Sequence, residues 1–147
     1  MKFSQCKPGR IYVISLENGD IVHQEIEQFA RNQSINAASL IIIGGADKGS
    51  KLVVGPEHDN KLPVSPMEHI LENVHEIVGA GTLFPDQEGY PVLHLHMACG
   101  WKSFTKTGCI RRGVKVWHTM EVILFELLES TGRRRFDPHT GFARLRL

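Results

Sequence analysis

The sequence predicts an α+β fold, a single domain over residues 1–147 with a mixed, mostly antiparallel β-sheet flanked by helices. The chain has 147 residues, of which 41% are hydrophobic, so it can bury the core of one domain. One amphipathic helix pattern stands near the N-terminus, and apolar strand patterns follow at short spacing. Too few helices remain to connect parallel strands, which favours antiparallel pairing.

The N-terminal region contains the first strand and the helix. The pattern of residues Arg10 to Leu16 is typical of a strand, and the turn-forming pair Asn18-Gly19 follows it. The helix after Asp20 has one apolar face, because its apolar residues recur at intervals of three and four. They are Val22, Ile26, Phe29 and Ala30.

The remaining elements are predicted to be strands joined by turns. Residues 56–66 contain three prolines and predict an exposed loop. From about residue 130 the chain is a basic and turn-rich tail. The expected strands are "INAASLIIIGG", "KLVVG", "VHEIVGAGTLF", "PVLHLHMACG", "TKTGCIRR" and "VKVWHTMEVILFELL".

Composition narrows the classes of protein and the compartment. The net charge of +1 gives no global field that would attract nucleic acid. No apolar run approaches the ~20 residues of a membrane span, and "MKFSQCKPGR" lacks the apolar core of a signal peptide. Three cysteines form no disulfide framework. We therefore expect a cytoplasmic protein that does not enter a membrane, with free or metal-bound thiols.

Two histidines in the run "PVLHLHMACG" carry the strongest chemical signal. Side chains alternate along a strand, so His94 and His96 point to one face while Leu93, Leu95 and Met97 point to the other. Imidazoles in such an apolar run need partners for their ring nitrogens. Backbone carbonyls, carboxylates or a metal ion could each supply them.

Cys109 is the candidate third ligand. If the chain reverses between Lys102 and Ser103, opposed residues in the hairpin have numbers that sum to a constant, and His96 then faces Cys109. His94, His96 and Cys109 form a three-ligand set for a divalent transition metal, with zinc first and iron, nickel or copper also compatible. Cys99 lies on the opposite face, so we expect it to be a core thiol.

Two further residues, His118 and Glu121, stand in the apolar run "VWHTMEV". A strand histidine that donates to a carbonyl is the simpler interpretation of His118, and metal ligation is the alternative. A carboxylate in such a run needs a partner or a raised pKa, so Glu121 could be a buried anchor or a general base. We favour the anchor.

Together, these segments and their order resemble the PPC domain family, the domain conserved in plants and prokaryotes. The resemblance rests on "GRIYVISLENGD", the helix, "AASLIIIGGADKG", "VHEIVGAGTLF", "PVLHLHMACG", "TGCIRRG" and "HTMEVILFEL", and it extends from Gly9 to about Glu129. It implies a homotrimer. Prokaryotic members follow the His-x-His segment with Gly-Gly-His, where this chain has Thr107, Gly108 and Cys109.

The resemblance also implies a function. It suggests a trimeric, metal-containing binding module that binds DNA or a regulatory partner. The alternative is a metal-dependent enzyme that acts on a small molecule in a pocket between subunits. We favour the module, because no acid/base pair stands near the proposed metal in the sequence. The basic residues that could contact phosphates are Arg111, Arg112, Arg133, Arg134 and Arg135.

Overall fold

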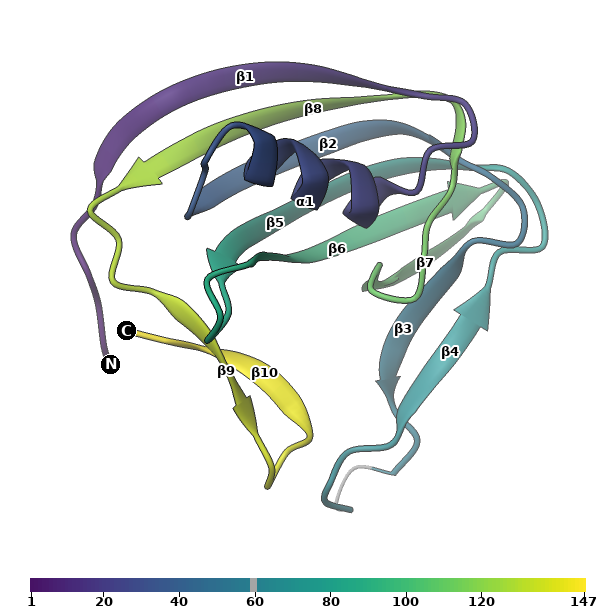
Figure 1. The fold of residues 1–147 in the computed structure, drawn as a ribbon. Helices are drawn as coiled ribbons and strands as arrows, with labels where there is room; N and C mark the ends of the chain where they lie inside the picture. Colours follow the sequence, from purple (N-terminus) through teal and green to yellow (C-terminus); the bar gives the residue numbers. More distant parts are fainter. Residues whose placement is uncertain (59–60) are drawn as a thin grey trace.

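A curved β-sheet wrapped around one helix forms the body of the protein (Figure 1). The computed structural model describes residues 1–58 and 61–147. The first elements are β1 (Lys7–Glu17), α1 (Val22–Asn32), β2 (Ala38–Ala46), β3 (Lys51–Pro56) and β4 (Pro66–Ile70). They are followed by β5 (His75–Pro85), β6 (Pro91–Trp101), β7 (Phe104–Cys109), β8 (Val116–Leu128), β9 (Arg133–Asp137) and β10 (Phe142–Arg146).

The main sheet has eight strands in the order β1-β8-β2-β5-β6-β7-β3-β4, and β9 and β10 form a separate two-stranded sheet. Every strand pairing within the described residues is antiparallel. The prediction of a mostly antiparallel sheet is therefore confirmed. The expectation of flanking helices was overstated, because the described chain forms only α1, whose 11 residues are too few to cross a bilayer.

Helix α1 follows the predicted apolar pattern. Val22, Ile26 and Ala30 are fully buried against the sheet, and Phe29 packs edge-on against Tyr12 with ring centroids 5.0 Å apart. Asp20 does not cap this helix. Its carboxylate instead accepts a hydrogen bond from the backbone N–H of Glu17 in the turn before it.

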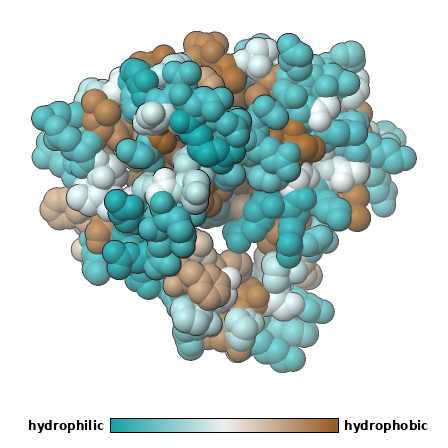
Figure 2. Space-filling model, in the orientation of Figure 1, coloured by the Kyte–Doolittle hydropathy of each residue, from teal (hydrophilic) through white to brown (hydrophobic). Residues whose placement is uncertain are grey.

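The face of the sheet that packs on α1 is the inner face, and it holds the core. Leu40, Ile42, Leu95, Met97 and Leu124 project from three strands, β2, β6 and β8, and are at most 1% exposed. Burial of apolar surface of this kind is the main favourable term in folding. On the side of the molecule drawn in Figure 2, hydrophilic residues predominate, with hydrophobic ones scattered among them.

The opposite, outer face of the same sheet exposes apolar side chains in rows that run across the strands. One row follows the registered pairs from β1 to β7, and it ends at His96 and Cys109. Neighbouring rows add exposed Ile11, Phe125, Ile43 and Val78. The first row consists of Val13, Ile123, Ile41, Ala80, His96 and Cys109.

The basic, turn-rich C-terminal tail forms a hairpin of β9 and β10 that extends below the main sheet (Figure 1). It contacts β5, where Arg134 donates a hydrogen bond from Nη2 to Oγ1 of Thr82 at 2.8 Å. Thr82 pairs with His94 in the sheet register. The tail therefore reaches the outer face next to the histidine pair.

Candidate metal centre

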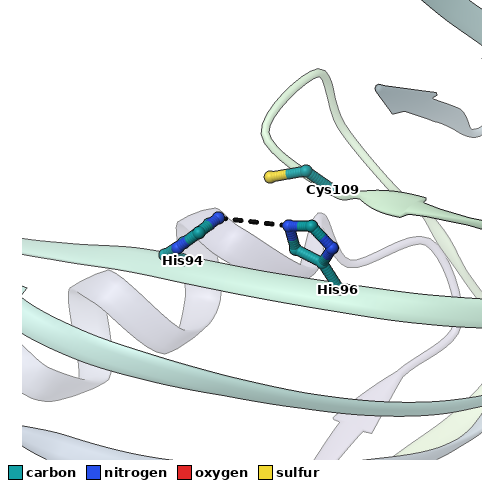
Figure 3. Close-up of side chains that lie close together, drawn as sticks. All are labelled: His94, His96 and Cys109. Carbon is teal, nitrogen blue, oxygen red and sulfur yellow. Dashed lines mark hydrogen bonds between the residues drawn. The ribbon is translucent and has the colours of Figure 1, made fainter. Parts of the chain in front are cut away.

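Three side chains from two adjacent strands meet on the outer face, as Figure 3 shows. His94 and His96 project from β6, and Cys109 ends β7. The predicted hairpin register is confirmed, since His96 is directly opposite Cys109. One potential ligand atom from each residue lies within 4.8 Å of the others.

Close contacts fix the geometry of this cluster. The two histidine Nε2 atoms are 3.1 Å apart, and the rings meet edge to face with centroids 5.0 Å apart. Cys109 is 3% exposed, and Arg111 donates from Nε to its Sγ at 3.1 Å. The arginine therefore holds the sulfur in place beside the two imidazoles.

The electrostatic surroundings keep both imidazoles neutral. Burial lowers the pKa of His94, and the positive charges of Arg134 and Arg111 lower it further. Burial also lowers the pKa of His96, with additional contributions from His94 and Arg111. Neutral imidazole is the form that coordinates a metal, so both rings are ready for ligation at neutral pH.

The donor set fits a divalent transition metal. Two imidazole nitrogens and one sulfur are preferred zinc ligands, and three protein ligands leave a fourth position for water or another molecule. Within the described chain, neither ring has a hydrogen bond to a carboxylate or a backbone group, and each is within hydrogen-bond distance of the other alone. A metal would give each Nε2 the partner that the strand itself does not provide.

Cys99 differs from Cys109, as expected. It is fully buried on the inner face, and burial raises the pKa of its thiol to about 11. A thiol with such a pKa stays protonated at neutral pH and is a poor ligand. All three cysteines, Cys6 included, are free.

His118 and Glu121 do not join the cluster. His118 lies at a bulge in β8, with φ of 58°, and its backbone N–H donates to Oδ1 of Asn18. Gly44, across the bulge, has φ of 134° and no room for a Cβ beside the Thr119 carbonyl. Glu121 is exposed on the outer face, so the interpretation as a buried anchor was wrong.

The five arginines proposed to contact phosphates have different surroundings. Arg112 forms an ion pair with Glu68 at 2.8 Å. Arg134 is only 6% exposed, whereas Arg133 and Arg135 on the same strand are exposed. Arg111 contacts the candidate metal ligand Cys109. These residues therefore do not form one basic surface.

Sequence reasoning missed the position of Arg134 beside the candidate metal centre. The tail is polar and turn-rich in sequence, so no strong apolar alternation predicts its strands. The sequence signal for this hairpin is Gly132, followed by short segments of alternating polar and apolar residues on either side of a turn near Gly141. That pattern predicts a hairpin only weakly, and it does not say where the hairpin docks.

A curved antiparallel sheet around one helix, with a His-x-His and Cys cluster on its outer face, defines the class of protein. Residues 3–128 match the model of the Plants and Prokaryotes Conserved (PCC) domain, which is also written PPC. The chain belongs to this family, and the resemblance seen in the sequence is confirmed.

Solved structures of similar fold come from archaea and bacteria. A metal-containing protein from Archaeoglobus fulgidus superposes with a TM-score of 0.84, is 23% identical, and both chains are covered completely. A protein of Ralstonia eutropha JMP134 named "putative DNA-binding protein" gives a TM-score of 0.68 at 26% identity. That match covers 92% of this chain and 90% of the other.

A sequence relative places the same domain in a larger protein. The bifunctional protein GlmU of Synechococcus sp. strain JA-3-3Ab is 28% identical over 139 residues. The match covers 94% of this chain but 20% of the relative, so the chain spans about a fifth of the length of the curated relatives that it matches.

Proposed function

We propose that the chain is a single-domain, metal-containing binding module whose centre is His94, His96 and Cys109. The observation that carries the proposal is the convergence of these three ligand atoms within 4.8 Å on one face of a hairpin. Zinc is the metal that this set suits best, and iron, nickel and copper accept the same donors. The metal-containing relative from Archaeoglobus fulgidus supports the assignment at the level of the fold.

A bound zinc ion would supply Lewis acidity at its open coordination position. The chain's own residues prepare that position. His94 and His96 remain neutral, and Arg111 holds the Cys109 sulfur through its Nε. The free thiols support a reducing compartment such as the cytoplasm.

We also propose that three copies assemble as a homotrimer through the outer face. Val13 on β1 is 82% exposed, Val78 on β5 is 60% exposed and Ile41 on β2 is 50% exposed, and in the sheet order β8 lies between β1 and β2. A contiguous apolar surface of this kind typically marks an interaction site. The row that contains Val13 and Ile41 ends at His96 and Cys109, so assembly would bring a neighbouring subunit close to the metal centre.

DNA binding or regulation is the second candidate function, and the name of the Ralstonia relative favours it. Exposed Arg133 and Arg135 are the residues free to reach phosphates. Such binding should weaken steeply as salt rises, because phosphate contacts release counterions. Duplex binding measured at several salt concentrations tests it, and no binding at low salt would remove this candidate.

A metal-dependent enzyme that acts on a small molecule is the third candidate. The cavity beside the three ligands favours it, because a substrate could reach the open coordination position there. The described residues that line this cavity include no carboxylate that could act as a general base.

Metal content per chain, measured after purification without added metal, tests the main proposal. We expect the wild type and Cys99→Ser to retain about one metal per chain. Cys109→Ser should lose most of it, whereas Cys109→His should retain it, because imidazole replaces thiolate as a ligand. Full occupancy in the double variant His94→Ala, His96→Ala would show that the metal binds elsewhere.

A further inference from the structure

The metal centre lies at the wall of a cavity of about 750 Å³. The outer face of β5, β6 and β7 forms one wall, and the tail hairpin of β9 and β10 forms the other. A volume of this size is typical of sites that bind small molecules. Much of the lining is apolar, and it includes Val92, Phe142 and Leu145.

A buried guanidinium points into this cavity without a full set of partners. Arg134 is 6% exposed, and one of its terminal nitrogens, Nη2, donates to Thr82 at 2.8 Å. Its Nε is buried and has no hydrogen-bond partner within the described chain. The group lies over the ring of Phe84 at 5.7 Å, so one side of it is apolar. A buried cation normally pairs with a carboxylate, and this one does not.

A second guanidinium faces the same cavity. Arg111 donates from Nε to the Cys109 sulfur and stacks over the ring of Phe142 at 5.2 Å. Neither Arg111 nor Arg134 forms an ion pair with a carboxylate of the described chain. No described carboxylate lines the cavity. Arg144, which also lines the cavity, forms an ion pair with Asp137, and Arg10 and Arg112, which do not line it, each contact an acidic side chain.

We propose that this cavity binds a small organic carboxylate, with the carboxylate group between Arg134 and Arg111 and the apolar part against Val92, Phe142 and Leu145. A guanidinium presents two parallel N–H groups that match the two oxygens of a carboxylate. The apolar walls fit a ligand with a hydrocarbon or aromatic body. The inference deepens the proposed function, because the open metal position faces the same cavity.

The site does not suit the phosphates of a DNA duplex. The side chain of Arg134 projects from β9 toward Thr82 of β5 with 6% of its surface exposed, where a continuous nucleic-acid backbone cannot follow it. The exposed neighbours Arg133 and Arg135 point away from the cavity and are absent from its lining. The buried and the exposed arginines of β9 therefore serve different partners.

Calorimetric titration of the zinc-loaded full chain tests the inference, with benzoate as the probe and benzamide as its neutral isostere. Benzoate should bind at least about tenfold more tightly than benzamide, which is the size of effect expected for one hydrogen bond between charged groups. Arg134→Met should weaken the binding of benzoate by a similar factor. The matched control, Arg133→Met on the same strand, should leave its affinity unchanged.

A second pair of variants keeps the test independent of how well Arg134→Met folds. Phe142→Glu places a carboxylate at the cavity wall. This carboxylate should compete with benzoate for the arginines and so weaken the binding of benzoate. Phe136→Glu is the control, because Phe136 is 62% exposed on the same hairpin and does not line the cavity.

Several results would overturn the inference. They are equal affinity for benzoate and benzamide, no benzoate binding to the wild type, equal effects of Arg134→Met and Arg133→Met, and tighter binding of inorganic phosphate than of benzoate. Titration of metal-free protein separates this inference from the metal proposal. Benzoate binding that still depends on Arg134 without metal supports the carboxylate site, while metal content alone decides the metal proposal.

Discussion

The two faces of the sheet differ in what completes them. On the inner face, the chain provides its own cover, because α1 packs on β6, where Leu95 and Met97 have no exposed surface. On the outer face, His94, His96 and the apolar rows beside them remain open. Alternation along one strand thus separates the residues that fold the domain from those available to a metal, a ligand or another copy.

The two buried cysteines show the same difference between the inner and outer faces, with the same thiol group on each. Cys99 faces the core, and burial raises the pKa of its thiol. Cys109 is equally inaccessible, but Arg111 donates to its sulfur and two imidazoles lie beside it. Surroundings, and not burial alone, therefore distinguish an inert thiol from a candidate ligand.

The largest expected effect concerns assembly through the outer face. Ile41→Glu places a charge in the middle of the apolar rows, and burying an unpaired charge in an interface is strongly unfavourable. The wild type should scatter light with three times the chain mass of 16.5 kDa, and the variant with one. A control change at the exposed helix position Gln28, Gln28→Glu, should remain trimeric. A monomeric wild type would contradict the proposed assembly.

The next effect concerns stability and compares neighbours on β6. Leu95→Ala should lower the free energy of unfolding by about 3 kcal/mol, because it leaves a cavity in the core. His96→Ala, one residue away on the outer face, should change it by no more than about 0.5 kcal/mol in the metal-free protein. Denaturant unfolding with a chelator present, at fixed protein concentration, measures both. Equal losses would mean that the faces are not separated as described.

A smaller effect concerns the dependence of stability on pH. Glu126 is 7% exposed and accepts hydrogen bonds from the side chain and backbone of Arg10, which lower the pKa of its carboxyl. A carboxyl with a depressed folded pKa stabilises the protein fully above its unfolded value of about 4.3. This contribution is lost as pH falls through the folded pKa. Glu126→Gln should therefore reduce the slope of stability against pH below about 4.5. An unchanged slope would contradict the assignment.

The sequence predicted the parts of the site that depend on local alternation and on hairpin symmetry. The shared face of His94 and His96 follows from their spacing, and the opposition of His96 and Cys109 follows from a reversal at Lys102 and Ser103. Both inferences use contacts that are close in the sequence. The single helix was likewise found from its apolar face.

Contacts between distant segments were not predictable in the same way. Arg134 meets Thr82 across 52 residues, and Arg10 meets Glu126 across 116. The docking of the tail hairpin depends on how β5 curves and on Phe84, which lies beneath Arg134. The bulge at His118 similarly depends on close packing against Gly44 and Gly45. Such features come from the assembled sheet and have no short sequence pattern.

X-ray absorption at the zinc edge of the zinc-loaded protein tests the central claim, that one metal binds His94, His96 and Cys109 on the outer face. The account predicts nitrogen or oxygen neighbours at about 2.0–2.1 Å and a single sulfur at about 2.3 Å. The sulfur should vanish in Cys109→Ser and persist in Cys99→Ser. A zinc environment without sulfur in the wild type, or one that keeps its sulfur in Cys109→Ser, would contradict it.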